Sequence, residues 1–293
     1  MKGDLAEVHD EWPNRAASRY VEAGGLRWHV QELGTEGPWV LLLHGTGAAT
    51  HSWAGIAPLL AQHFRVIAPD LPGHGYTDPA AREQQSLPGM AALVASLVDE
   101  LGVDPKLVVG HSAGAAVLIR MTLDGLLRPA SIVSFNGALL PFEGLMGKIF
   151  PRAARFLAAL PILPGMLARR AKRSPMVDRL IQQTGSQSAS LDLVHYQSLS
   201  QSPRHIRGVL AMMANWDLAA LERDLLELDT PLHLVACAND RAVPAAQARY
   251  LKSRLACARL RIVHELGHLG HEENPALFAG FVEEAAAEVG LLD

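Results

Sequence analysis

Residues 106–114, Lys-Leu-Val-Val-Gly-His-Ser-Ala-Gly, decide the fold of this chain. They open on the largely apolar run 106–110, which is typical of a strand buried on both faces of a sheet. A helical pattern follows over residues 112–123. The turn between them matches G-x-S-x-G, the pattern that holds a nucleophilic serine between a strand and a helix. Ser112 has the alternative role of a helix cap, but its position directly after a strand favours a nucleophile.

The residue types of this turn suit that chemistry. Flanking glycines let the strand and the helix approach each other without clashes between Cβ atoms. A strained backbone at the turn leaves the serine Oγ free to react. The first N–H groups of a helix have no partners within the helix, so they can bind a developing oxyanion. The backbone N–H of Ala113 is therefore the predicted first donor of an oxyanion hole.

The second oxyanion donor is predicted in the loop after another buried strand. That strand is the apolar run 39–43, and the loop is His44-Gly-Thr-Gly47. Small residues there would let the backbone N–H of Thr46 face the oxyanion from the side opposite Ala113. Loss of one such donor typically lowers the rate by about 10²–10³.

A serine hydroxyl needs an acid and a base to assist it, and in this kind of site they follow the serine in the order acid, then histidine. Asp240 comes just after the apolar run 232–237 and is the predicted acid. Its alternative role is that of a turn residue beside Asn239. Asp217 is a rival acid, but it lies in a helical region and follows no strand.

His268 follows the last predicted strand, residues 259–263, and is the predicted base. It would take the proton of Ser112, while Asp240 would fix the imidazole tautomer and stabilise the imidazolium. His264 and His271 lie nearby in the chain and are the alternative bases.

Residues 264–268 also spell His-Glu-Leu-Gly-His, which matches the H-E-x-x-H motif of zinc proteases. That motif requires a helix, whereas this segment directly follows a strand-like run and contains Gly267. The third histidine of the longer motif is absent, because position 274 is Asn. We therefore predict no metal site and no cofactor.

Further apolar runs and helical patterns alternate along the chain. Strands are predicted at 64–68 and 131–135 in addition to those above, and helices at 52–63, 90–101, 245–255 and 275–289. Strands that alternate with helices of ten to fifteen residues predict an α/β fold, in which a parallel sheet carries helices on both faces.

Residues 139–225 interrupt this alternation, because they lack strand runs and are rich in Pro, Met and Arg. We predict a helical cap inserted into a core formed by residues 1–138 and 226–293. The cap would lie above Ser112, at the ends of the strands where open sheets bind ligands. The predicted substrate-binding residues are large apolar side chains: Trp53 from the core, and Met146, Phe150, Met213 and Trp216 from the cap.

The predicted cap is also basic. Residues 141–180 contain eight Lys and Arg against two acidic residues, whereas the whole chain has a net charge of −4. Three interpretations stay open: binding of a bulky apolar substrate that carries carboxylates, contact with an anionic membrane surface, and a solvated face with no role.

Composition excludes several classes of protein. The 293 residues are 49% apolar, which is enough for a large core and too much for a disordered chain. The net negative charge gives no reason to expect nucleic acid as a partner. Two cysteines cannot form a disulfide framework, the N-terminus lacks the apolar region of a signal peptide, and the apolar stretch 156–167 is too short to span a bilayer. We therefore expect a cytoplasmic protein.

The loop 44–47, the turn around Ser112, and the positions of Asp240 and His268 together resemble the α/β-hydrolase superfamily. The resemblance covers nearly the whole chain outside the insertion, and it implies a mostly parallel sheet of eight strands. Many relatives have a second glycine where this chain has Ala115, a mild departure.

Within that superfamily the chain is similar to the magnesium-chelatase accessory proteins of bacteriochlorophyll biosynthesis. The segments that carry this similarity are 12–15, 22–30, 135–142, 211–217 and 267–273. It implies a role near the insertion of magnesium into a tetrapyrrole.

Two functions follow. The first is a serine hydrolase that cleaves an ester-type bond of a bulky apolar small molecule, such as a tetrapyrrole derivative. The second is a non-catalytic accessory protein that binds porphyrin or magnesium chelatase through the basic cap. Dehalogenase and epoxide-hydrolase chemistry are disfavoured, because those enzymes use Asp as the nucleophile and this chain has Ser112.

Overall fold

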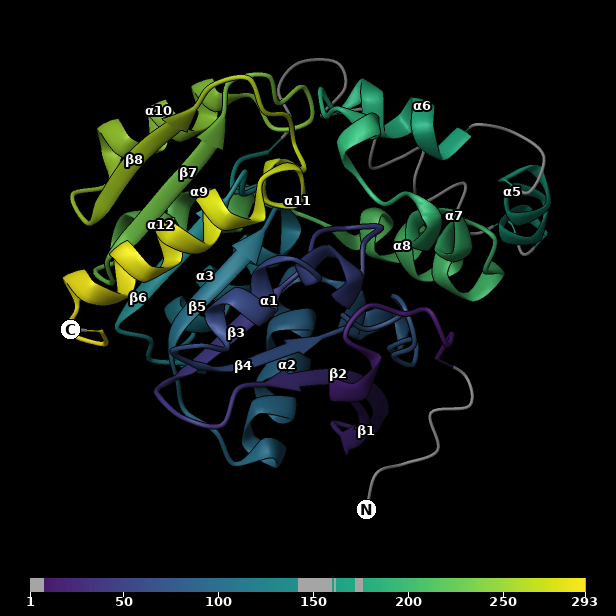
Figure 1. Cartoon of the computed structure of the whole chain (residues 1–293), viewed down its shortest axis with the longest axis horizontal. Coiled ribbons are helices and arrows are strands. Elements are labelled where there is room, and N and C mark those ends of the chain that lie inside the picture. Colours follow the sequence, from purple (N-terminus) through teal and green to yellow (C-terminus); the bar gives the residue numbers. More distant parts are fainter. Residues whose placement is uncertain (1–7, 142–159, 161, 172–175, 293) are drawn as a thin grey trace.

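The computed structural model describes residues 8–141, 160, 162–171 and 176–292. Its centre is one eight-stranded sheet in the order β1-β2-β4-β3-β5-β6-β7-β8 (Figure 1). The strands are β1 (Ser18–Ala23), β2 (Leu26–Leu33), β3 (Trp39–Leu43), β4 (Arg65–Pro69), β5 (Pro105–His111), β6 (Ser131–Phe135), β7 (Leu232–Cys237) and β8 (Ala258–Val263). β2 is antiparallel to both of its neighbours, and all pairs from β4 to β8 are parallel. The predicted mostly parallel eight-stranded sheet is thus confirmed.

The hairpin of β1 and β2 was not among the predicted strands. Its two strands are joined by Gly24 and Gly25, which both have positive φ angles (57° and 77°). Only glycine adopts such angles without strain, and the pair closes a tight turn. The hairpin lies at the edge of the sheet and is only partly buried, so its sequence lacks the continuous apolar runs that reveal the central strands.

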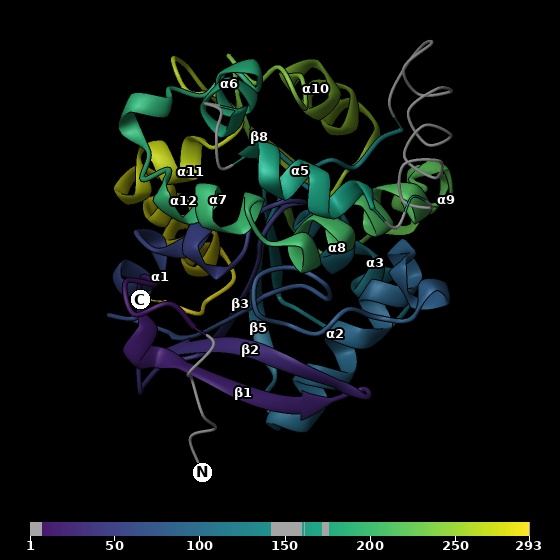
Figure 2. The same cartoon turned by 90° about the vertical axis from the view of Figure 1, so that its right-hand side faces the viewer.

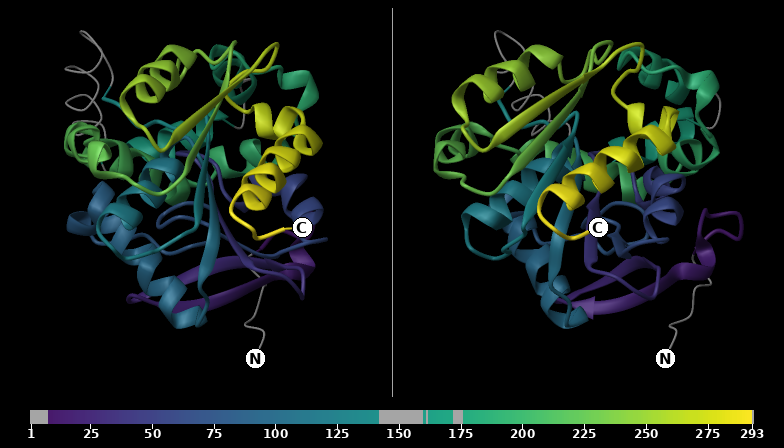
Figure 3. Two further views of the ribbon diagram at one scale, coloured as in Figure 1. Left: turned by 90° about the vertical axis from the view of Figure 1, so that its left-hand side faces the viewer. Right: turned by 60° about the vertical axis from the view of Figure 1, so that its left-hand side comes forward.

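Helices cover both faces of the sheet, as predicted (Figure 3). α2 (Leu87–Leu101), α3 (Ala113–Leu123) and α10 (Ala245–Arg254) contribute to the larger core cluster. α1 (Ile56–Leu60) and α12 (Pro275–Glu288) form the other core with the opposite face. The helix predicted at 52–63 is shorter than expected, because the short 3-10 helix η2 (Thr50–Trp53) takes its start and Gly55 separates the two.

Between β6 and β7, the regular structure of the described residues is helical. It comprises α5 (Leu163–Ala171), α6 (Met176–Gln183), α7 (Val194–Ser200), α8 (Pro203–Asn215), α9 (Ala219–Asp224) and two short 3-10 helices. α5 to α8 lie together at one end of the sheet, beyond the carboxyl ends of the parallel strands (Figures 1 and 2). None of the described helices is long and apolar enough to cross a membrane.

Candidate active site

Ser112 occupies the sharp turn between β5 and α3. Its backbone has φ 51° and ψ −116°, a left-handed conformation that is strained for a residue with a side chain. A Cβ at Gly110 would lie 2.4 Å from the backbone N of Ala115, and one at Gly114 would lie 2.1 Å from the carbonyl O of Leu43. Both glycines of the motif are therefore needed for strand and helix to pack this closely.

Asp240 and His268 form a buried pair. Asp240 lies in the turn after β7, and its Oδ2 is 2.7 Å from Nδ1 of His268. Its other oxygen, Oδ1, accepts hydrogen bonds of 2.8 Å from the backbone N–H groups of Ala242 and Val243. The backbone thus orients the carboxylate, and the carboxylate orients the imidazole. This leaves Nε2 of His268 as the ring nitrogen available to a nucleophile.

His268 is tied to the turn that carries Ser112. His111, the residue before Ser112, donates from Nε2 to the carbonyl O of His268 at 3.0 Å, and the two rings lie 4.7 Å apart. Asn136, just after β6, donates to the same carbonyl at 2.9 Å and accepts at 2.7 Å from the backbone N–H of Cys237. The ends of β5, β6 and β7 and the loop of His268 are therefore held together at one point.

The loop 44–47 passes directly over the Ser112 turn. A Cβ at Gly45 would lie 2.9 Å from Cβ of Ser112 and 2.8 Å from Nδ1 of His111, so only glycine fits there. His44 fixes the start of the loop, because its Nε2 accepts from the N–H of Leu71 at 2.9 Å and its Nδ1 donates to the carbonyl O of Gly45 at 2.8 Å. Burial lowers the pKa of His44, which favours the neutral imidazole that this pair of bonds requires.

Cap helix α8 holds the other end of this loop. His205 donates from Nε2 to the carbonyl O of Gly47 at 3.2 Å and accepts at Nδ1 from the N–H of Gly75 at 3.1 Å. The hydroxyl of Thr46 donates to Sδ of Met212 at 3.7 Å. Burial lowers the pKa of His205 to about 4, so the imidazole stays neutral near pH 7 and can accept at Nδ1.

Asp70 binds the backbone of the two loops that follow β3 and β4. It is fully buried, and it accepts from the backbone N–H groups of Thr50 at 2.6 Å and Tyr76 at 2.9 Å. Burial by itself would raise the pKa of Asp70, but the neighbouring His29, whose Nδ1 is 2.8 Å from Oδ2, lowers it well below the usual range. No local sequence pattern marks Asp70 as a buried carboxylate.

A cavity of about 370 Å³ lies beneath the cap helices and reaches His111, the residue before Ser112. Its floor is polar and includes Thr46, His111 and His268. Its walls are apolar and come mainly from α5, α6 and α8: Leu167, Met176, Val177, Leu180, Ile181, Ile206, Val209 and Leu210. No Asp, Glu, Lys or Arg is among the lining residues that the structure describes. Its size and character suit a small apolar ligand.

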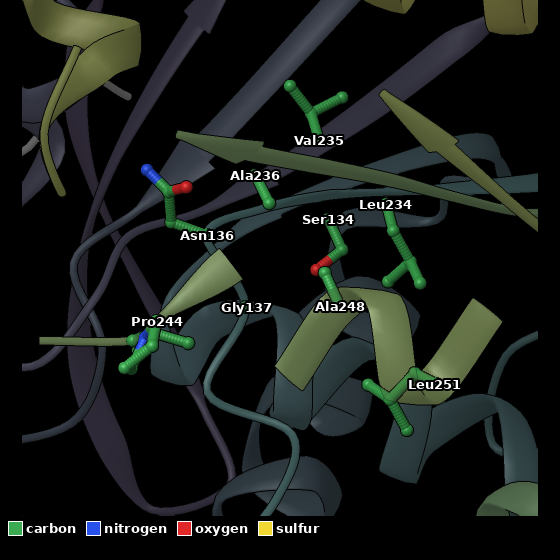
Figure 4. A pocket seen from close by; sticks show the side chains of 10 residues that line it. Ser134, Asn136, Gly137, Leu234, Val235, Ala236, Pro244, Ala248 and Leu251 are labelled. Atoms are coloured by element: carbon green, nitrogen blue, oxygen red, sulfur yellow. The ribbon is translucent and has the colours of Figure 1, made fainter. Parts of the chain in front are cut away.

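A second cavity lies between β6, β7 and α10 (Figure 4). Its volume is about 10 Å³, which is room for no more than a water molecule. Ser134, Leu234 and Ala248 line it. Its size excludes it as a substrate site.

Three of the predicted substrate-binding residues, Trp53, Met213 and Trp216, do not line the larger cavity, and these predictions need correction. Trp53 is fully buried, with its ring 5.1 Å from that of His271, and it belongs to the core between the sheet and α1. Trp216 packs against the other core cluster. The apolar character of Trp53 and Trp216 reflects packing. Met146 and Phe150 lie outside the described residues.

The rival site residues have other surroundings. His264 is exposed in a bend after β8, so residues 264–268 do not form the helix that a zinc-protease motif needs. His271 is fully buried and lies 2.9 Å from Oγ of Ser52. Burial lowers its pKa to about 3. Asp217 is exposed and accepts from the backbone N–H of Ala219 at the start of α9.

Sequence reasoning missed a polar contact between cap and core. Tyr196 of α7 lines the cavity, and its hydroxyl donates to Oε1 of Glu272 at 2.7 Å. The hydroxyl of Ser52 donates to the same oxygen at 2.5 Å. Burial raises the pKa of Glu272 to about 7. No local pattern marks these residues, since the partners are far apart in sequence.

Comparison with known proteins agrees with this architecture. A model of the alpha/beta hydrolase family matches residues 40–281, and the chain belongs to that family. The chain is 39% identical over 262 residues to the "Magnesium-chelatase 30 kDa subunit" of Rhodobacter capsulatus, covering 89% of this chain and 91% of that protein. It is also 26% identical to the "2-hydroxy-6-oxononadienedioate/2-hydroxy-6-oxononatrienedioate hydrolase" of Klebsiella pneumoniae subsp. pneumoniae, covering 90% of this chain and 93% of that one.

The fold also matches solved structures. An alpha/beta hydrolase fold protein from Burkholderia ambifaria superimposes with a TM-score of 0.76 at 24% identity, covering 97% of this chain and 99% of that one.

Proposed function

We propose that the protein is a serine hydrolase that uses Ser112, His268 and Asp240 to cleave an ester-type bond. The observation that carries the proposal is the oriented Asp240–His268 pair, with its 2.7 Å contact, tied to the strained turn of Ser112. A serine that only caps a helix requires neither a strained backbone nor a neighbouring Asp–His pair.

In the proposed reaction, Oγ of Ser112 attacks the ester carbonyl while Nε2 of His268 takes its proton. The oxyanion that forms is bound by the backbone N–H groups of Thr46 and Ala113. His268 then returns the proton to the leaving alcohol, which leaves an acyl group on Ser112. Water, activated by His268 in the same way, releases the acid and restores the serine.

We infer that the group bound in the cavity is apolar and uncharged. The described walls are aliphatic and no charged side chain is among the described lining residues, so a carboxylate buried against these walls would lack a partner and be costly. Of the eight basic residues within 141–180, Arg169, Arg170 and Arg179 are described, and none of them lines the cavity. The other five lie outside the described residues. A tetrapyrrole substrate would therefore place an esterified, neutral edge in the cavity.

A panel of p-nitrophenyl esters tests the proposal. Medium-length aliphatic acyl groups should be hydrolysed faster than the same groups ending in a carboxylate. Ser112→Ala should abolish turnover, whereas Ser200→Ala, which removes another serine hydroxyl lining the cavity, should retain it. Equal activity of Ser112→Ala and the wild type would overturn the assignment.

A second candidate function is that of an accessory protein in bacteriochlorophyll biosynthesis, which binds magnesium chelatase or porphyrin through the basic cap. The similarity to the Rhodobacter capsulatus protein named as a magnesium-chelatase subunit favours it. Affinity capture of chelatase subunits by the wild type and by Ser112→Ala separates the two functions. Capture that survives the substitution, in a protein without hydrolase activity, would favour the accessory role.

A further inference from the structure

Two cap helices, α5 and α6, carry exposed apolar and basic side chains. We call the surface with these side chains the cap face and define it by six residues: Ile162, Met166, Arg169 and Arg170 at α5, and Arg179 and Leu180 on α6. The exposed fractions of Ile162, Met166 and Leu180 are 73%, 60% and 53%. Figure 2 looks onto this side of the molecule, where α5 and α6 face the viewer.

The two sides of α5 differ in the way an amphipathic helix requires. Residues three, four or seven positions apart share one side of a helix. Pro164, Ala168 and Ala171 follow this spacing and are buried. Ile162, Met166 and Arg169 follow it as well, and all three are exposed. The apolar residues of the exposed stripe are therefore not required for packing the cap.

The cap face borders the opening of the cavity. Leu180 lines the cavity and is also more than half exposed, which places it at the mouth. On α5, Leu167 lines the cavity beside the exposed Met166. A surface that contacts the cap face would thus meet the entrance of an apolar cavity.

We infer that the cap face docks on an anionic phospholipid membrane. Flexible aliphatic side chains can enter the boundary between head groups and acyl chains, while the guanidinium groups meet the lipid phosphates. Asp178 is the one acidic residue described on α5 and α6, and its carboxylate accepts from Gln182 at 3.0 Å. An apolar molecule dissolved in the bilayer would then reach the cavity without crossing water. Only its cleavage rests on the proposed hydrolase function.

Flotation with vesicles of phosphatidylcholine, with and without phosphatidylglycerol, tests the inference. The full-length protein should float with the anionic vesicles, and less so as salt is raised. Arg169→Glu/Arg170→Glu should lower the partition coefficient at least tenfold, and Ile162→Ser/Met166→Ser should lower it without changing its salt dependence. The matched control is Arg249→Glu/Lys252→Glu on α10, two exposed basic residues away from the cap face.

In vesicle-free buffer, all these variants should have the melting temperature of the wild type and should hydrolyse a soluble ester at the wild-type rate. If the folded wild type stays unbound, or if the α10 control loses binding as strongly as the cap-face variants, the inference is wrong. Equal binding to neutral vesicles would also overturn it. An inactive protein that still floats would refute the hydrolase proposal and leave membrane docking standing, so the two failures are distinguishable.

Discussion

At the scale of single residues, the site depends on how Asp240 divides its two oxygens. Oδ1 is occupied by two backbone N–H groups, and Oδ2 faces Nδ1 of His268. The carboxylate therefore has one orientation, and it presents its charge to the one nitrogen that must carry a proton. This arrangement orients the proposed base, His268, before any substrate arrives.

Asp240→Asn tests that role. The amide keeps the size of the side chain but loses the charge that stabilises the imidazolium, and it can favour the wrong imidazole tautomer. We expect kcat for a soluble ester to fall by about 10³–10⁴ with little change in KM. Steady-state kinetics measure kcat and KM separately. A drop smaller than tenfold would mean that Asp240 has only a structural role in its turn.

Glu272 gives a prediction about pH. Its folded-state pKa is raised to about 7 by burial, whereas an exposed Glu titrates near 4.3. Burial penalises the charged form of Glu272 in the folded state but not in the unfolded state. The folded state therefore has its full stability below about pH 4, and part of that stability is lost as the pH rises through 7. Over that window the wild type should lose up to about 3 kcal/mol of unfolding free energy relative to Glu272→Gln.

Denaturant unfolding at a series of pH values measures this difference. Gln keeps an acceptor oxygen for Ser52 and Tyr196 but cannot ionise. A stability difference between the two proteins that stays constant from pH 4 to pH 8 would show that Glu272 does not titrate in this range.

At the scale of elements, cap helix α8 holds the loop 44–47, which carries the proposed oxyanion donor Thr46. Its His205 bonds to Gly47, one residue beyond Thr46, and to Gly75 in the neighbouring turn. The helix can approach this closely because Gly208 packs against Gly73, where a Cβ would lie 2.0 Å from the Gly73 carbonyl O. The cap thus sets the position of a loop in the core.

His205→Ala should lower kcat by about 10², because the loop is no longer held where Thr46 can bind the oxyanion. His205→Gln can still donate to the carbonyl O of Gly47, so it should recover most of the loss. His195→Ala is the control, since His195 is a buried histidine of the neighbouring helix α7. Ester kinetics with thermal melting check the result. Equal losses in the Ala and Gln variants would argue against positioning through this bond.

A pair of glycine substitutions tests the packing itself. Gly208→Ala should destabilise the protein by about 1–3 kcal/mol, because the added methyl group meets backbone that cannot yield easily. Gly280→Ala in α12 should instead stabilise by about 0.5–1 kcal/mol, since no atom lies within 4 Å of the added Cβ and alanine favours helix. Denaturant midpoints measure both changes. Similar effects at the two positions would contradict the close contact of α8 with residue 73.

At the scale of the whole molecule, the sequence predicted what depends on local patterns. The buried strands have continuous apolar runs, and Ser112, Asp240 and His268 each follow a strand, so their places in the fold could be inferred one by one. The carboxyl ends of neighbouring parallel strands meet at one edge of a sheet, which is why these three could be expected to lie together.

Contacts between distant segments could not be predicted in this way. His205 and Gly75 are 130 positions apart, and Tyr196 and Glu272 are 76 apart. Neither pair has a spacing signal. Trp53 was wrongly predicted to line the substrate pocket, because a large aromatic residue near the site is equally consistent with a pocket wall and with the core. Its burial depends on how α1 packs on the sheet.

The most direct test of the central claim is labelling of the purified protein with a fluorophosphonate probe. We predict one covalent adduct, located on Ser112 by peptide mapping. Ser112→Ala and His268→Ala should both abolish it, and Ser200→Ala should keep it. A folded wild-type protein that stays unlabelled, or labelling that persists in Ser112→Ala, would contradict the claim that Ser112, His268 and Asp240 form a working catalytic site.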